Sequence, residues 1–136
     1  MDSKSFIFKL IPTMKKIIII LLSCCVSISY GQSIPSLLEG IWVGQGYQLN
    51  TNETWSIQLI VEGDSSKIYY STIPCKSELY IIQKSDNKFI FDEVVTDGIC
   101  VKNGYVELEI IDLNTIRYKW RFDSGEPGAI AELMKF

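Results

Sequence analysis

The sequence lacks histidine altogether: none of its 136 residues is one. This absence excludes Ser-His-Asp and Cys-His catalysis, and it removes the commonest general base and the His ligands of zinc sites. A helical apolar period is also missing. The longest apolar stretch, near the N-terminus, is well short of the ~20 residues that a membrane-spanning helix needs. The sequence therefore favours neither a helical fold nor the usual catalytic and metal sites.

The N-terminal segment has the three parts of an export signal. Basic residues follow Met14, an aliphatic run covers 17–22, and small residues precede a cleavage position after Gly31. We expect residues 1–31 to be removed, which leaves a mature chain that begins at Gln32. Because residues 1–13 add nothing that a signal requires, we expect translation to start at Met14.

A second route of export competes with the first. The sequence Leu-Leu-Ser-Cys at 21–24 resembles a bacterial lipobox, in which Cys24 would be lipidated. The protein would then be held at the membrane by a lipid anchor alone. The sequence leaves open which route applies, and both place the protein in the periplasm, at the cell surface or outside the cell.

The charge of the mature part limits its partners. Residues 1–31 hold four of the 13 basic residues and one of the 16 acidic ones, which leaves 9 basic and 15 acidic residues and a net charge of −6. An acidic domain repels phosphate backbones, so nucleic acid is not an expected partner. The remaining ~105 residues can bury one modest core, and we expect a single domain over 32–136.

Only Cys75 and Cys100 remain once the signal is removed. Exported proteins meet oxidising compartments, so we predict that these two cysteines form a disulfide. The alternative is a pair of free buried thiols. If they are paired, neither a cysteine nucleophile nor a thiolate metal site remains.

Period-two alternation of apolar and polar residues runs through the mature chain and predicts an all-β fold. Short breaks rich in Gly, Asn, Asp and Ser separate the alternating runs and force neighbouring strands to pair antiparallel. An eight-stranded antiparallel meander can hide its edges by closing into a small barrel. The predicted strands are 40–49, 54–62, 67–73, 78–84, 88–96, 105–111, 116–122 and 129–135.

Two hairpins predict a register. A three-residue loop at 113–115 would place Leu108 opposite Trp120 on the inner face, whereas a two-residue loop would oppose apolar and basic residues. The same register sets Glu107 opposite Arg121 on the outer face. A turn at 86–87 would place Cys75 opposite Gly98, close enough to Cys100 for a disulfide.

The segment Leu-Glu-Gly-Ile-Trp-Val-Gly at 38–44 resembles the Gly-x-Trp start of lipocalins and other calycin barrels. More closely, the mature chain resembles a family of small secreted bacterial domains of uncharacterised function. The shared elements are this start, a strand that ends Tyr-x-x-x-x-Cys at 70–75, Phe-x-Glu at 91–93, Cys100 and Tyr-x-Trp at 118–120. This resemblance implies a lipocalin-like barrel.

The sequence departs from true lipocalins in ways that bear on function. It is much shorter, and it lacks the helix that follows the last strand. Lys135 is the only candidate in the last strand for the basic residue that would cover Trp42. A roomy ligand cup is therefore not implied.

The positions of the acidic residues in the sequence give little support for catalysis by a pair of carboxylates. Asp92 and Glu93 are adjacent in a strand and face opposite sides, so they cannot act together on one bond. Glu107 and Glu109 share a face, but each has a basic partner on the next strand. We expect no enzyme, no cofactor and no metal site.

Aromatic residues are the feature most suggestive of function. Five of them could line a cavity for a small apolar ligand: Trp42, Tyr70, Phe91, Tyr118 and Trp120. The alternative is that they fill a barrel of this size completely.

The sequence thus predicts a non-catalytic binding or accessory domain, either for a small hydrophobic ligand in the barrel or for a protein. In the protein-contact alternative, rim loops would bind the partner, as in a protease inhibitor. The identity of the ligand or partner, the presence of a cavity and the oligomeric state remain open.

Overall fold

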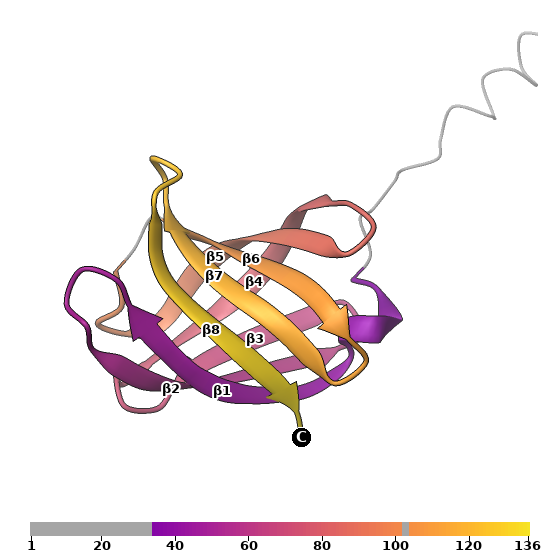
Figure 1. The fold of residues 1–136 in the computed structure, drawn as a ribbon, viewed down its shortest axis with the longest axis horizontal. Coiled ribbons are helices and arrows are strands. Elements are labelled where there is room, and N and C mark those ends of the chain that lie inside the picture. Colours follow the sequence, from indigo (N-terminus) through magenta and orange to yellow (C-terminus); the bar gives the residue numbers. More distant parts are fainter. Residues whose placement is uncertain (1–33, 102–103) are drawn as a thin grey trace, which may run out of the picture. The chain divides into compact units, whose positions relative to one another are not determined.

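The computed structural model describes residues 34–101 and 104–136, which form an eight-stranded antiparallel β-barrel (Figure 1). Each strand pairs with the next one along the chain, and the last pairs with the first, so the meander closes without an edge. The predicted fold class is confirmed. The predicted signal, its cleavage after Gly31 and the possible lipidation of Cys24 lie outside the described residues.

One short 3₁₀ helix, η1, precedes the barrel, and no described residue belongs to a helix long and apolar enough to cross a membrane. The strands lie within a few residues of the predicted ranges. The elements are η1 (Ser36–Leu38), β1 (Gly40–Gln48), β2 (Thr54–Glu62), β3 (Ser65–Tyr70), β4 (Cys75–Lys84), β5 (Lys88–Gly98), β6 (Gly104–Asp112), β7 (Thr115–Phe122) and β8 (Pro127–Lys135).

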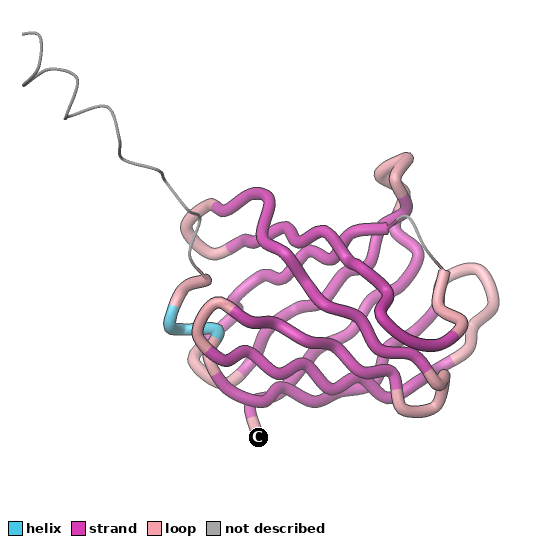
Figure 2. The backbone as a smooth tube through the Cα atoms, turned by 180° about the vertical axis from the view of Figure 1, so that it is seen from behind, coloured by secondary structure: helices cyan, strands magenta, loops and turns pink. Residues whose placement is uncertain are grey.

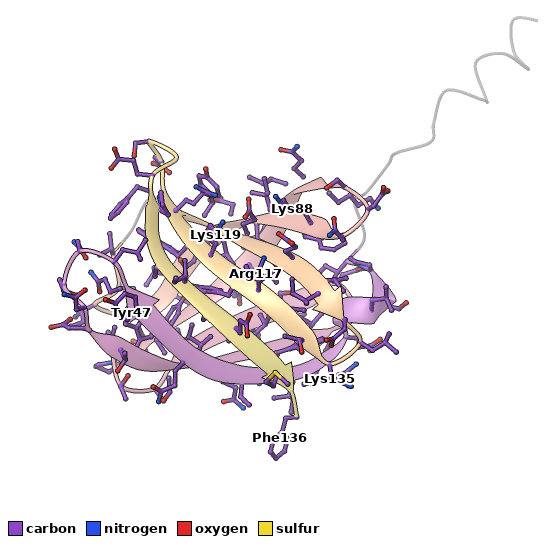
Figure 3. The ribbon with its side chains drawn as sticks, viewed as in Figure 1. Tyr47, Lys88, Arg117, Lys119, Lys135 and Phe136 are labelled. Carbon is purple, nitrogen blue, oxygen red and sulfur yellow. A yellow bond between two sulfur atoms is a disulfide. The ribbon has the colours of Figure 1, made fainter. Side chains whose placement is uncertain are left out.

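Alternation along each strand assigns its inner and outer faces. In β7, Ile116, Tyr118 and Trp120 are buried, while Arg117 and Lys119 lie on the outer surface (Figure 3). The same period in the other strands builds one apolar core inside the barrel. The register of a strand with one buried face is strongly specified, because a one-residue slip would exchange its two faces.

One end of the barrel is closed by η1 and by the residues that meet it (Figure 1). Leu38 is fully buried there, and its carbonyl accepts a 2.8 Å hydrogen bond from Nε1 of Trp42. Lys135, opposite Trp42 on β8, places its ammonium 5.3 Å from the centre of the indole ring, a cation–π distance. The backbone carbonyl of Leu38 therefore satisfies the one polar side-chain atom of Trp42, and Lys135 covers its ring.

The opposite end carries the β1–β2, β3–β4, β5–β6 and β7–β8 connections (Figure 2). It has no counterpart of η1 among residues 34–101 and 104–136. We refer to it as the open end. The candidate site described below lies there.

The β6–β7 register differs from the prediction. Trp120 lies opposite Val106, and Leu108 lies opposite Tyr118, so the predicted pairing of Leu108 with Trp120 is wrong by one step of two residues. The loop has two residues, and an extra residue in β6, Ile111, forms a bulge next to it. This bulge restores the match between apolar faces that a two-residue loop alone would have lost.

The outer face of this hairpin nevertheless carries the expected opposite charges. Glu107 lies opposite Lys119, with 3.8 Å between its carboxylate and the ammonium, and Arg121 approaches the same carboxylate diagonally at 3.9 Å. Arg117 pairs with Glu109 at 3.6 Å. Long side chains reach diagonal neighbours, which is why the Glu107–Arg121 contact survives the change of register.

The disulfide between Cys75 and Cys100 is present, and their Cα atoms lie 5.7 Å apart. Cys75 lies opposite Gly98, as predicted. The pairing is reached through two register shifts that cancel: Ile82 is an extra residue in β4, and Thr96 is an extra residue in β5. A disulfide forms in oxidising compartments and is consistent with an extracellular or periplasmic location.

Glycine makes room for the largest side chain near the open end. The indole of Trp120 lies between Gly104 on β6 and Gly128 on β8, and a Cβ at either position would collide with the ring. Gly128 is also the extra residue of a bulge between β7 and β8. At these two positions β6 and β8 therefore contribute only backbone to the surroundings of Trp120.

Candidate binding pocket

A pocket of about 150 Å³ opens among the side chains at the open end. An apolar cavity of about this volume accommodates a benzene ring. Residues from β1, β2, β3, β5, β7 and β8 and from the β3–β4 and β5–β6 connections line it: Gln48, Trp55, Tyr70, Ile73, Glu93, Ile99, Cys100, Val101, Tyr118, Trp120, Phe122, Gly128 and Ala129. The barrel interior is therefore partly empty at the open end.

Glu93 is the carboxylate in the pocket wall, and only 9% of its surface is exposed. Its Oε1 accepts a 2.9 Å hydrogen bond from the hydroxyl of Tyr70. Its Oε2 accepts a 2.7 Å hydrogen bond from Nε1 of Trp120. Both donors are neutral, so the carboxyl group is held by two fixed dipoles from β3 and β7 rather than by an opposite charge.

A third polar group extends this network. The hydroxyls of Tyr70 and Tyr118 lie 3.0 Å apart. Because the single proton of Tyr70 is directed to Glu93, Tyr118 is the donor in the second bond. The three side chains form a chain of hydrogen bonds across the interior, from β7 through β3 to β5.

Burial dominates the acid–base properties of the network. It raises the pKa of Glu93 above its usual value, and the neighbouring Ser77 hydroxyl and the donors on Tyr70 and Trp120 oppose that rise. Burial also raises the pKa of Tyr70 and of Tyr118, with the nearby Glu93 carboxylate adding to both shifts. The two phenols therefore keep their protons, and Glu93 is the group that titrates at the lowest pH.

Trp55 supplies a polar atom that lacks a partner. It lies in the pocket wall at the start of β2, with 7% of its surface exposed. Its indole packs over the backbone of Gly46 on β1. Its buried Nε1 donates to no acceptor within residues 34–101 and 104–136. Such a donor is costly unless water or a ligand accepts its hydrogen bond.

The structure separates the five aromatic residues predicted to line a cavity. Tyr70, Tyr118 and Trp120 lie in the pocket wall. Trp42 and Phe91 are fully buried in the packed core outside the pocket lining. Three of the five aromatic residues therefore line the pocket, and the other two belong to the core. Cys100, half of the disulfide, also contributes to the wall.

Sequence reasoning missed Glu93 and Trp55 as members of this site. The period-two pattern held a signal for both. Glu93 follows Phe89 and Phe91 on the inner face of β5, and Trp55 precedes Ile57 on the inner face of β2. A glutamate that shares one face of a strand with buried aromatic residues is expected to point into the barrel interior.

Within the described ranges, no group of three or more Cys, Asp or Glu side chains is arranged to hold a metal ion. Comparison with models of known protein families gives no match, and comparison with curated proteins gives none either.

Proposed function

We propose that this protein is a non-catalytic, exported domain that binds a small molecule in the pocket at the open end of its barrel. The observation that carries the proposal is the composition of that pocket wall. The aromatic wall includes a buried carboxyl group, Glu93, and Trp55, whose buried indole Nε1 has no partner among the described residues. Apolar walls with a few convergent polar groups are typical of small-molecule sites.

The pocket favours binding over catalysis. Glu93 is the only acidic side chain among the described lining residues, and the sulfur of Cys100 is engaged in the disulfide. The phenols of Tyr70 and Tyr118 keep their protons because burial raises their pKa values. A hydrolytic mechanism needs a second acid, base or nucleophile that these residues do not supply.

Kinship with lipocalin-like barrels and export to the periplasm, cell surface or medium form part of the proposal. The closed end supports the kinship, because Trp42 of the Gly-x-Trp start lies under η1 and beside Lys135. The disulfide and the N-terminal signal pattern support export.

Titration calorimetry with benzyl alcohol, a neutral ligand whose ring has the size of the cavity, tests the proposal. We expect saturable binding at one site, together with a change in tryptophan fluorescence, because Trp55 and Trp120 lie in the wall. Ala129→Leu should abolish the binding, since the added side chain enters the pocket from β8.

Ile130→Leu is the matched control for this variant. It adds no volume, and Ile130 is the next residue of the same strand, on the outer face. Binding should persist unchanged in this control. Binding that survives Ala129→Leu with wild-type affinity would place the ligand elsewhere and contradict the proposal.

Protein contact through the rim loops is the second candidate, and one observation favours it. Ile99 and Val101, on either side of Cys100, are 81% and 61% exposed at the open end. Exposed apolar side chains at a loop tip are common in contact surfaces. Capture of a protein from the native envelope fraction that is lost in Ile99→Ser, with small-molecule binding absent, would favour this candidate.

A further inference from the structure

The charge environment of Glu93 differs from that of the other deeply buried glutamate. Glu107 on the outer face is 8% exposed and has Lys119 and Arg121 within 4 Å. Glu93 is 9% exposed and is held by neutral donors. Buried carboxylates are normally paired with an opposite charge. The described wall of the pocket contains neither lysine nor arginine.

The Glu93 carboxylate retains capacity for further donors. An ionised carboxyl group offers about four lone-pair sites, and Tyr70 and Trp120 occupy one on each oxygen. A ligand that enters the pocket can therefore add hydrogen bonds without displacing either side chain. An ammonium group supplies both the donors and the missing charge.

The remainder of the wall suits a cation as well. Five aromatic rings surround the cavity: Trp55, Tyr70, Tyr118, Trp120 and Phe122. The faces of such rings attract a cation, and the attraction is stronger when the cation is desolvated. The net charge of −6 on residues 32–136 adds a long-range attraction for positive ligands.

Resting on the proposed function, we propose that the ligand is a small organic cation, whose ammonium group pairs with Glu93 and whose apolar body lies against the aromatic wall. The cavity volume limits that body to roughly the size of one six-membered ring. Neutral ligands of the same size should bind more weakly, and anions should be excluded by the carboxylate.

Three ligands that share one ring and differ in charge test this inference: benzylammonium, benzyl alcohol and benzoate. We expect benzylammonium to bind at least about tenfold more tightly than benzyl alcohol, which corresponds to about 1.4 kcal/mol. Benzoate should bind most weakly. If benzyl alcohol binds as tightly as benzylammonium, the cation inference fails while the proposed function stands. If none of the three binds, both fail.

Two matched variants assign the preference to one carboxylate. Glu93→Gln keeps the shape of the side chain and should reduce the affinity for benzylammonium to that for benzyl alcohol. Glu107→Gln removes an equally buried carboxylate on the outer face and should leave both affinities unchanged. Equal loss of benzylammonium affinity in both variants would show a general charge effect and would overturn the assignment to Glu93.

A pH series on the wild-type protein keeps the inference testable if Glu93→Gln does not fold. Benzylammonium remains protonated across the acidic range, whereas Glu93 gains a proton as pH falls through its raised pKa. Affinity for benzylammonium should therefore fall with pH, while affinity for benzyl alcohol stays constant. A parallel response of the two ligands would overturn the inference.

Discussion

The indole Nε1 of Trp120 and Oε2 of Glu93 lie 2.7 Å apart and form a hydrogen bond that joins β7 to β5 through the barrel interior. Trp120 also contributes a face to the pocket, and its ring fits between two glycines. One residue thereby belongs to the packed core and to the candidate site at once. Its replacement should affect stability first and binding as a consequence.

Trp120→Ala should lower the free energy of unfolding by about 3–5 kcal/mol. This is the usual cost of truncating a large buried aromatic, and here Oε2 of Glu93 also loses its donor. Lys119→Ala, on the outer face of the same strand, should cost less than about 1 kcal/mol, because Glu107 keeps Arg121 and exposed ion pairs contribute little. Chemical denaturation compares the two, and a Trp120→Ala protein of wild-type stability would show that the indole is not core.

The stability of the wild-type protein should depend on pH through Glu93. Because burial raises the pKa of this carboxyl in the folded state, the folded protein binds the proton more tightly than the unfolded chain does. The free energy of unfolding should therefore fall as pH rises from about 4.3, the ordinary glutamate pKa, through the raised value. Glu93→Gln should lack this component in denaturation measured over the same pH series. Superimposable profiles would show that Glu93 is not desolvated.

Loss of the disulfide should destabilise the barrel. Cys75 and Cys100 are 25 residues apart, and the chain-entropy model gives about 3–4 kcal/mol for a closed loop of that length. The double variant Cys75→Ala/Cys100→Ala should show this loss in denaturation, and reductant should affect the wild type but not the variant. Peptide mapping without reduction should recover the two cysteines linked. Two alkylatable thiols in the native protein would contradict the assignment.

The mature protein should begin at Gln32. The signal pattern that ends at Gly31 predicts this cleavage, and the competing lipobox predicts a diacylglyceryl group on Cys24 instead. Intact-mass measurement of the protein recovered after export distinguishes the two. A mass that includes a lipidated Cys24 would show that the lipoprotein route operates.

The sequence was sufficient to predict the barrel, because eight strands with alternating apolar and polar residues and short connections allow few other arrangements. The burial of Trp42 and Trp120 followed from the same alternation. The Cys75–Gly98 pairing followed from the turn at 86–87, and it was right because the bulges at Ile82 and Thr96 cancel. The β6–β7 register did not, because a bulge leaves no clear trace in a pattern of apolar and polar residues. Ile111 reads as one more apolar residue until its partner strand is known.

The candidate site was predicted only in part, for a related reason. The period-two alternation places Tyr70, Tyr118 and Trp120 on the inner face. It does not show where along the barrel axis the side chains leave a cavity. That depends on how side chains from strands far apart in sequence meet, as when η1 fills the closed end above Trp42. The inward direction of Glu93 is present in the pattern, because this residue shares one face of β5 with Phe89 and Phe91.

The cancelling bulges at Ile82 and Thr96 set a rule for how the chain can change length. Each of these two residues is the position in its bulge that has no partner on the opposite strand. Deleting either one alone would therefore make the ladder regular at that point and leave Cys75 opposite Gly98. Deleting a paired residue between the two bulges would instead move the strand by one position, and buried side chains beyond the deletion would turn outward. Deletions in this ribbon are therefore expected to be tolerated at Ile82 and Thr96 and not at the paired positions between them.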